Sequence, residues 1–438
     1  MINIKQKISF TLALIIILMI PGTISFGEEL DLTAKAAFLM DMKTGQVLYE
    51  KNADMRWKPA STTKIMTALV ALEQGSLDQE MKASSNALNS IPSDYGLAGI
   101  KIGEIMTMND LLNFVLIISA NEAANVVAEN ISPSGTIDGF VTLMNNKAQE
   151  LGLLNTHYTN TYGLDEDNHY STARDLATAS KVAMENSTFR KIVSLKEVPL
   201  PNTNLRKSED WDRWHIESTN KLLKSTSDYY DRVTGIKTGY TGGAGMCLVF
   251  SAVNAEGLEL LGVILGTESY DILYKESQEL LEYGFINFKN QTLVSSGEFY
   301  GRYEVLDSLG NIPVDLQTLG QVSHLLPTSK DKLDAEVTTV ETLETPLSAP
   351  IEKGQILGYK TWHYKGEEIG SIQLVSMNDI EKTMEAKIRD KFNELVENNI
   401  IRNVLILIGA IIILFIILRI VLKTISRRRN RYNRRYRL

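Results

Sequence analysis

The alternation of apolar and polar residues predicts an α/β unit in the first two thirds of the chain. Strand-like runs lie near its start and its end, and runs with apolar residues three or four apart lie between them. The expected strands are 37–41, 46–49, 233–237, 246–253 and 258–265. The expected helices are 61–72, 109–118, 121–129, 138–151 and 270–285. Strands at both ends with helices between them favour a mixed or antiparallel sheet covered by helices.

The pattern changes after about residue 288. Short alternating runs separated by turn residues predict a small β-rich domain, with strands expected at 300–305, 312–316, 333–340 and 371–375. An amphipathic helix is expected next, because apolar residues recur at spacings of three or four. These residues are Ile380, Met384, Ile388, Phe392 and Leu395.

Two apolar segments near the chain ends predict its cellular location. Residues 8–20 are apolar and follow Lys5 and Lys7, which is typical of a secretory signal; an uncleaved anchor is the alternative. Residues 403–422 are almost wholly apolar, and at about 1.5 Å per residue a helix of this length crosses a roughly 30 Å hydrocarbon core. Seven arginines and no acidic residue follow this segment, so the tail is expected in the cytoplasm and the middle of the chain outside it.

Charge and cysteine content narrow the possible functions. The chain has a net charge of −8, but twelve basic residues lie in the two terminal segments, so the stretch between them carries −20. This acidity does not suit a nucleic-acid-binding protein, and the basic tail is expected to meet lipid headgroups instead. Cys247 is the single cysteine, which excludes an intrachain disulfide, and no CxxC or HExxH motif is present. We therefore expect neither a metal nor a cofactor.

Three short motifs carry the candidate chemistry. They are Ser61-x-x-Lys64, Ser119-x-Asn121 and Lys237-Thr238-Gly239. Each is weak evidence by itself, since all three patterns occur again in the chain, as in Lys43-Thr44-Gly45 within a predicted hairpin turn. Their context strengthens them, because Ser61 and Lys64 share one face at the start of a helix, Ser119 lies at a break between helices, and Lys237 is expected to end a strand.

The first two motifs suit nucleophilic catalysis. A serine hydroxyl is a poor nucleophile until a base removes its proton. Lys64 acts as that base for Ser61 only when neutral, and burial, the helix N-terminus and nearby Lys237 would each lower its pKa. Ser119 is placed to relay a proton between Lys64 and the leaving amine.

The remaining motif residues suit binding of a peptide end. Asn121 is expected to hold a backbone amide of the substrate, and Lys237 with Thr238 to bind a terminal carboxylate. Gly239 would let the substrate lie along the strand edge as an added strand.

The motifs and their surroundings resemble the D-alanyl-D-alanine carboxypeptidases, the low-molecular-mass penicillin-binding proteins. The matching stretches are Lys58-Pro59-Ala60-Ser61-Thr62-Thr63-Lys64, Ser119-Ala120-Asn121-Glu122-Ala123-Ala124, Asn160-Thr161-Tyr162-Gly163-Leu164, His169-Tyr170-Ser171-Thr172-Ala173-Arg174-Asp175, Thr219-Asn220-Lys221-Leu222-Leu223 and Gly235-Ile236-Lys237-Thr238-Gly239-Tyr240-Thr241. The resemblance covers about residues 34–287. It implies a serine β-lactamase/transpeptidase-like fold with an antiparallel sheet and helices.

The same resemblance implies an activity. Enzymes of this family form an acyl-serine with peptidoglycan stem peptides ending in D-Ala-D-Ala, release the terminal D-alanine and are inhibited by β-lactam antibiotics. It implies an oxyanion hole made by the backbone N–H groups of Ser61 and Tyr240. His169, Glu122 and Cys247 are expected to have structural roles. The aromatic residues Trp211, Trp214, Tyr229 and Tyr230 are expected to pack in the core or to border the groove.

Other functions of the same fold stay open at this stage. A class A β-lactamase would need a deacylating glutamate in an E-x-x-L-N run, and the stretch from Glu150 to Asn155 has one residue too many. An endopeptidase that cuts peptidoglycan crosslinks is a second alternative. An inactive membrane-tethered scaffold is a third, which the intact motifs disfavour.

These inferences divide the chain into six expected segments. They are a signal peptide (1–27), a penicillin-binding peptidase domain (28–288), a β-rich domain (289–379), an amphipathic linker helix (380–402), a transmembrane helix (403–422) and a basic cytoplasmic tail (423–438).

Overall fold

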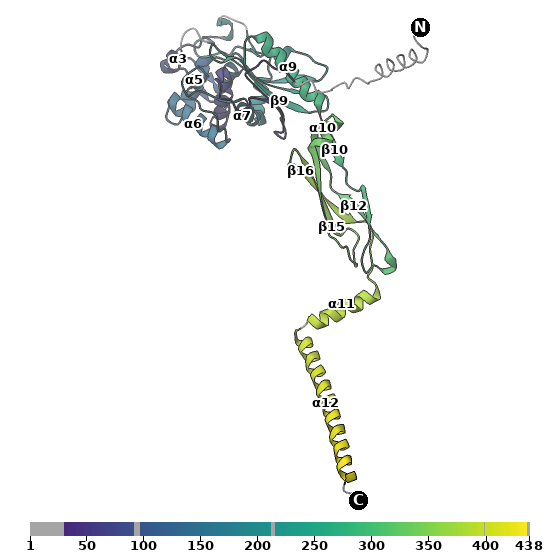
Figure 1. Ribbon diagram of the computed structural model, residues 1–438. Helices are drawn as coiled ribbons and strands as arrows, with labels where there is room; N and C mark the ends of the chain where they lie inside the picture. The colour runs from purple at the N-terminus through teal and green to yellow at the C-terminus, as the bar shows by residue number, and fades with distance from the viewer. Residues whose placement is uncertain (1–29, 92–96, 212–214, 398, 436–438) are drawn as a thin grey trace, which may run out of the picture. The chain divides into compact units, whose positions relative to one another are not determined.

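The computed structural model describes residues 30–91, 97–211, 215–397 and 399–435 (Figure 1). These residues form two compact units. The first contains the described residues up to Lys289 together with Pro327–Ser329, and the second contains Asn290–Leu326 and the described residues from Lys330. The expected signal peptide, residues 1–27, lies outside the described residues.

A five-stranded sheet forms the centre of the first unit, with the strand order β2-β1-β9-β8-β7. Its strands are β1 (Ala36–Asp41), β2 (Val47–Lys51), β7 (Arg232–Thr241), β8 (Gly245–Val253) and β9 (Glu259–Thr267). Every neighbouring pair is antiparallel, which confirms one of the two expected sheet types.

Lys237 was expected to end its strand, and this was wrong: β7 continues to Thr241. The cross-strand pairing with β8 extends to the turn at Gly245.

Helices cover both faces of this sheet. They are α2 (Lys64–Gln74), α3 (Ser85–Asn89), α4 (Met108–Leu116), α5 (Asn121–Ile131), α6 (Ile137–Glu150), α7 (Ala173–Glu185), α8 (Ser187–Val193) and α9 (Tyr270–Asn287). On β1, Phe38 meets Arg174 of α7, and its neighbour Leu39 lies against Gly284 of α9. Because successive residues of a strand point to opposite faces, α7 and α9 lie on opposite sides of the sheet. The central strands are therefore almost continuously buried.

Local interactions set where the helices begin. The helix expected from Asn109 instead begins after Thr107, whose hydroxyl accepts from Asp110 N at 3.2 Å while Asp110 Oδ2 accepts from Thr107 N. This reciprocal capping box satisfies two N–H groups that would otherwise lack partners. The helix expected from Ser61 begins as a 3-10 turn, η1 (Ala60–Thr63), and becomes α-helical at Lys64.

Short elements complete the first unit. They are β3 (Glu80–Lys82), β4 (Ile105–Thr107), β5 (Glu197–Pro199), β6 (His215–Glu217), η2 (Ser208–Asp210) and η3 (Lys221–Lys224). One apolar cluster joins α2, α4 and α5 to the sheet, and Ala123 and Ala124 on α5 are fully buried within it. Cys247 is a free, buried thiol in the same cluster, so packing rather than covalent linkage stabilises this unit.

The second unit is β-rich, as expected. Its five-stranded sheet has the order β11-β12-β16-β15-β14, and β10 pairs separately with β13. The strands are β10 (Phe288–Val294), β11 (Phe299–Tyr303), β12 (Val314–Leu319), β13 (Val322–Pro327), β14 (Val337–Leu343), β15 (Ile356–Tyr364) and β16 (Glu367–Ser376), and a 3-10 turn, η4, spans Leu309–Asn311. The strand expected at 333–340 was wrong in its first half, where α10 (Lys330–Glu336) forms instead. The residues Lys330-Asp331-Lys332-Leu333-Asp334-Ala335-Glu336 have a high helix propensity that outweighed the alternation.

Two helices follow the β-rich sheet: α11 (Met384–Glu397) and α12 (Asn399–Arg435). Ile380 was expected in the amphipathic helix but is buried in the β-rich core, where its backbone pairs with Ile351. The apolar residues Met384, Ile388, Phe392 and Leu395 of α11 are exposed. Within α12, Ile400–Arg428 is long and apolar enough to cross a membrane, which makes it a candidate anchor.

Candidate active site

Ser61 is held in η1 by a close approach of the chain segment 160–164. Asn160 Oδ1 accepts hydrogen bonds from Gly163 N (2.7 Å) and Leu164 N (3.2 Å), which bends this segment into a tight turn. Gly163 has φ +93°, and a Cβ there would lie 1.8 Å from Ala60 O. Only glycine therefore lets the segment rest directly on the residue before Ser61.

Lys64 is fully buried beside Ser61. Its Nζ lies 2.9 Å from Ser61 Oγ, 2.7 Å from Asn121 Oδ1 and 2.8 Å from the carbonyl oxygen of Tyr162. Burial holds the pKa of Lys64 well below its ordinary value; the positive charge of Lys237 lowers it further, and Glu122 opposes the shift. The structure therefore brings together a hydroxyl and an amine whose burial opposes protonation.

Ser119 lies at the break between α4 and α5, as expected. Its φ of +65° is unusual for a residue with a side chain. Its Oγ is buried and, within the described residues, has no hydrogen-bond partner. Asn121 begins α5 and contacts Lys64 through its Oδ1, and Ser119 and Asn121 both line the cleft that contains Ser61.

Lys237, Thr238 and Gly239 lie on β7, an edge strand of the described sheet. A Cβ on Gly239 would lie 3.1 Å from both Pro59 O and Ser61 N, so the absent side chain lets β7 pack against η1. Lys237 is fully buried, its Nζ donates to Thr238 O at 2.9 Å, and burial lowers the pKa of Lys237 to about 7. Thr238 Oγ1 lies 2.7 Å from the hydroxyl oxygen of Thr219.

A cleft of about 160 Å³ lies between these elements. Its lining residues are Ser61, Ile118, Ser119, Asn121, Tyr162, Gly163, Leu164, Thr219, Thr238, Gly239, Tyr240, Thr241 and Tyr270. The lining includes all the expected site residues except the two lysines, which are buried behind it. Tyr162, Thr219 and Tyr270 were not assigned roles from the sequence, although Tyr162 and Thr219 belong to stretches that matched the family.

His169 supports the segment that contains Ser61 and is not among the residues that line the cleft. Thr159 N donates to His169 Nδ1 at 3.0 Å, and His169 Nε2 lies 2.9 Å from Thr63 Oγ1. Burial lowers the pKa of His169 to about 4, so the ring is neutral and its Nε2–H donates to Thr63 two residues after Ser61. These contacts agree with the expected structural role.

Glu122 and Cys247 also have structural contacts. The backbone N–H groups of Ala98 (2.6 Å) and Gly99 (2.9 Å) donate to Glu122 Oε1, which ties this segment to the start of α5. Burial raises the pKa of the Cys247 thiol to about 12, which leaves it protonated and unreactive at neutral pH.

The expected aromatic cluster does not act as one group. Trp211 packs on Phe114 in the core, with ring centroids 5.4 Å apart, and its indole N–H donates to Pro201 O. Tyr230 is buried, and Tyr229 is exposed. Trp214 lies outside the described residues.

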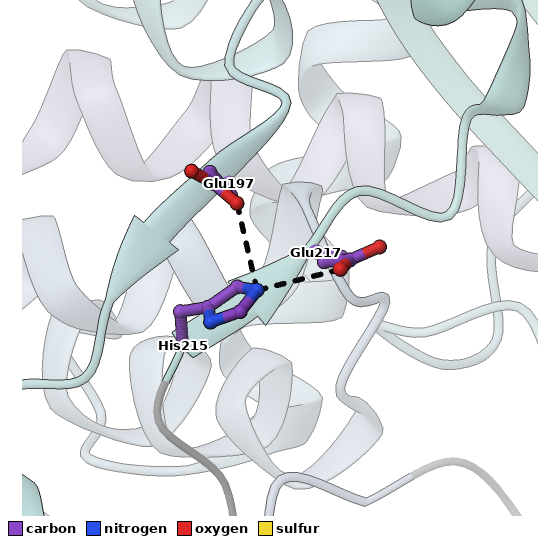
Figure 2. A group of neighbouring side chains, drawn as sticks. All are labelled: Glu197, His215 and Glu217. Atoms are coloured by element: carbon purple, nitrogen blue, oxygen red, sulfur yellow. Dashed lines mark hydrogen bonds and ion pairs between the residues drawn. The ribbon is translucent and has the colours of Figure 1, made fainter.

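Glu197, His215 and Glu217 form a surface cluster on the paired strands β5 and β6 (Figure 2). Glu197 and Glu217 are direct cross-strand partners, and His215 Nε2 lies 3.5 Å and 3.3 Å from their carboxylates. All three side chains are exposed, and Lys224 also pairs with Glu217 at 3.5 Å. Their contacts are those of a surface ion-pair network, in which His215 and Lys224 offset the repulsion between two facing carboxylates.

Comparison with known proteins shows which protein family the chain matches. Residues 24–269 match the family model for D-alanyl-D-alanine carboxypeptidase, and residues 288–382 match that for the penicillin-binding protein 5 C-terminal domain. The chain is 32% identical over 359 residues to D-alanyl-D-alanine carboxypeptidase DacF of Bacillus subtilis, covering 81% of this chain and 88% of that protein. DacA of Haemophilus influenzae is 32% identical over 355 residues, covering 80% and 86%.

Solved structures agree with this placement. Penicillin-binding protein 5 from Haemophilus influenzae superimposes with a TM-score of 0.58 at 31% identity, covering 80% of this chain and 98% of that one. The Streptomyces K15 DD-transpeptidase gives a TM-score of 0.54 at 32% identity, covering 58% of this chain and 98% of that one. The chain therefore belongs to the D-alanyl-D-alanine carboxypeptidase family and has the penicillin-binding-protein fold, with a β-rich C-terminal domain.

Proposed function

We propose that the chain removes the terminal D-alanine from peptidoglycan stem peptides through an acyl-ester on Ser61. The observation that carries this proposal is the buried Lys64 amine, 2.9 Å from the Ser61 hydroxyl at the wall of an open cleft. Family membership supports the reaction, and the geometry supports the roles proposed below.

The contacts of Lys64 suit a general base. A neutral lysine has two N–H groups and one lone pair. The shorter contacts, to Asn121 Oδ1 and Tyr162 O, are to oxygens that only accept, so they take the two N–H groups. The lone pair is then left for the Ser61 hydroxyl, which donates to it. Ser61 Oγ attacks the penultimate carbonyl while its proton passes to Lys64, and a tetrahedral intermediate forms.

Breakdown of this intermediate needs a proton on the leaving nitrogen. Ser119 is suited to transfer it from Lys64, because its buried hydroxyl has no partner among the described residues. The C–N bond breaks, D-alanine leaves and the acyl-ester remains on Ser61. The backbone N–H groups of Ser61 and Tyr240 would stabilise the oxyanion, and losing one such donor typically raises the barrier by about 3–4 kcal/mol.

The substrate would lie along β7. This edge strand offers backbone groups to an extended peptide. Asn121 Oδ1 is occupied by Lys64, so its Nδ2 is the atom left to hold a substrate carbonyl. Thr238 would donate to the terminal carboxylate, and Lys237, buried behind it, would supply positive potential.

Water completes the cycle by hydrolysing the acyl-ester. The residues that line the cleft in the described structure include no carboxylate, and Glu150 lies exposed at the end of α6, paired with Lys147. A dedicated glutamate for rapid deacylation, as a class A β-lactamase requires, is therefore not provided by these residues. A penicillin adduct on Ser61 would accordingly hydrolyse slowly.

The reaction would take place outside the cytoplasm. We propose that residues 1–27 direct export, that residues 403–422 within α12 span the membrane, and that the arginine-rich tail stays in the cytoplasm near anionic lipid. The domain bounds 28–288, 289–379 and 380–402 belong to the same proposal, with the amphipathic segment corrected to begin at Met384.

The test compares wild type with Ser61→Ala and with Ser329→Ala, a matched control from another Ser-x-x-Lys run. We expect wild type and Ser329→Ala to release D-alanine from diacetyl-Lys-D-Ala-D-Ala and to bind fluorescent penicillin covalently. Ser61→Ala should do neither while keeping its circular dichroism spectrum. Equal labelling of Ser61→Ala and wild type would refute the assignment. Labelling of wild type without D-alanine release would instead point to an endopeptidase that needs crosslinked substrate.

A further inference from the structure

Thr219 shares the end of the cleft with Thr238, although the two residues come from different elements. Thr219 precedes η3 and Thr238 lies on β7, and their hydroxyl oxygens are 2.7 Å apart. Both residues line the cleft that contains Ser61. Thr219 is solvent-exposed, whereas Thr238 is only 5% exposed, so an incoming ligand reaches Thr219 directly.

Several contacts fix the position of Thr219. Its backbone N–H donates to Ile117 O at 3.0 Å, just after α4, and Tyr274 Oη of α9 donates to its carbonyl oxygen at 3.1 Å. Asn220 Oδ1 accepts from Leu222 N at 3.1 Å and so starts η3 immediately afterwards. The Thr219 backbone is thus fixed by Ile117 and by Tyr274 of α9, and its hydroxyl lies against Thr238 of β7. A hydroxyl positioned in this way is preorganised, which reduces the entropy cost of binding a ligand.

The described lining of the cleft offers an anion no cationic side chain. None of its lining residues in the described structure is a lysine or an arginine. Lys237 is buried, and its Nζ donates to Thr238 O rather than reaching the cleft surface. Among the described lining residues, the donors available to a carboxylate at this end are neutral, with Lys237 acting through space.

We propose that Thr219 and Thr238 together bind the terminal carboxylate of the substrate, with one hydroxyl donating to each carboxylate oxygen. This inference rests on the function proposed above and adds Thr219 as a residue that determines specificity for a free chain end. In the unliganded cleft the two hydroxyls bond to each other, and Thr219 Oγ1 also lies 3.3 Å from Ile117 O. Rotation of both O–H groups redirects their hydrogens to the ligand without moving the backbone.

The test compares Thr219→Val, which keeps the branched shape and loses the hydroxyl, with Thr219→Ser, which keeps the hydroxyl. Each full-length variant is assayed on diacetyl-Lys-D-Ala-D-Ala and on the same peptide with a C-terminal carboxamide. We expect Thr219→Val to lower kcat/KM for the acid by about 10- to 100-fold, mainly through KM, because a hydrogen bond to a charged group is lost. For the carboxamide the change should stay within about threefold, and Thr219→Ser should resemble wild type on both peptides.

Acylation by benzylpenicillin, which carries a carboxylate, is also compared with acylation by its methyl ester, which does not. This assay measures acyl-enzyme formation and does not depend on product release. Thr219→Ala serves as a second deletion of the hydroxyl if the valine variant does not fold. If Thr219→Val loses activity equally on the acid and the carboxamide, Thr219 has a purely structural role and the proposal is overturned. The proposal also fails if the ratio of the two kcat/KM values is the same in Thr219→Val as in wild type. If wild type turns over neither peptide and is not acylated, the proposed function and the carboxylate pair both fall. Wild-type turnover with an unchanged ratio removes only the pair.

Discussion

At the scale of single residues, burial of Lys237 beside the proposed active site lowers the stability of the fold. Its folded pKa of about 7 lies below the ordinary 10.5, so between these values the unfolded chain binds more protons and wild-type stability rises with pH. Below about pH 7 the folded chain carries Lys237 in its charged form, so the full cost of burying this charge lowers the free energy of unfolding. Lys237→Met should therefore raise the free energy of unfolding by about 2–4 kcal/mol near pH 7 and abolish efficient D-alanine release.

Urea unfolding of both proteins at pH values from 6.5 to 9.5 measures this difference. The advantage of the methionine variant should shrink as pH rises, because only wild type gains from deprotonation of Lys237. Lys43→Met is the matched control, since Lys43 lies in the exposed second Lys-Thr-Gly run. An advantage that does not change with pH would contradict the assignment of this cost to the Lys237 charge.

The sequence named the residues of the proposed catalytic set at this scale, and it did not reveal their surroundings. Ser61, Lys64, Ser119 and the Lys237 strand carry short motifs whose residue types the chemistry requires. Tyr162 escaped a role because its backbone carbonyl, and not its side chain, contacts Lys64. Any residue type can supply a backbone carbonyl, so the sequence does not reveal such a contact. The sequence also does not reveal that Thr219 and Thr238 are neighbours, because folding brings them together.

At the scale of elements, the 160–164 turn packs against η1 and so supports Ser61, the proposed nucleophile. Gly163→Ala would force Cβ into Ala60 O and separate them. We expect a loss of more than about 3 kcal/mol of stability and, since Tyr162 O would leave Lys64, a drop in penicillin acylation of about 100-fold. Thermal unfolding and acylation kinetics measure the two effects.

Gly152→Ala provides the comparison for this substitution. Gly152 also has a positive φ, +70°, but a Cβ there would meet nothing within 4 Å. The strained backbone alone should lower stability by about 1 kcal/mol and leave acylation unchanged. If both variants behave alike, the contact between Gly163 and Ala60 does not position Ser61.

Element boundaries were harder to predict than element types. The buried strands β8 and β9 and the helices α5 and α6 followed their apolar patterns closely. The start of α4 depended on the reciprocal bonds of Thr107 and Asp110, and Ile380 was drawn into the β-rich core by pairing with Ile351. In both cases a specific hydrogen-bond partner, which periodicity does not reveal, decided the boundary.

At the scale of the whole molecule, the two units have separate apolar cores. The buried cluster of the catalytic unit is drawn from residues 36–265, and that of the β-rich unit from residues 294–380. The Streptomyces K15 DD-transpeptidase, matched over 98% of its length, corresponds to only 58% of this chain. A relative of that length indicates that a catalytic unit folds without a β-rich companion.

Two truncated chains test this division and the proposed anchor. A chain of residues 28–289 should be acylated by penicillin within about threefold of the full-length rate. It should unfold at a slightly lower temperature, because Thr328 no longer bonds to Asn287 O and Ile286 O, each bond contributing about 1 kcal/mol.

A full-length precursor that ends at Lys382 lacks α11 and α12, so it should leave the membrane fraction with its acylation rate intact. An unfolded 28–289 chain would show that the β-rich unit completes the catalytic core, and membrane retention of the Lys382 form would place the anchor elsewhere.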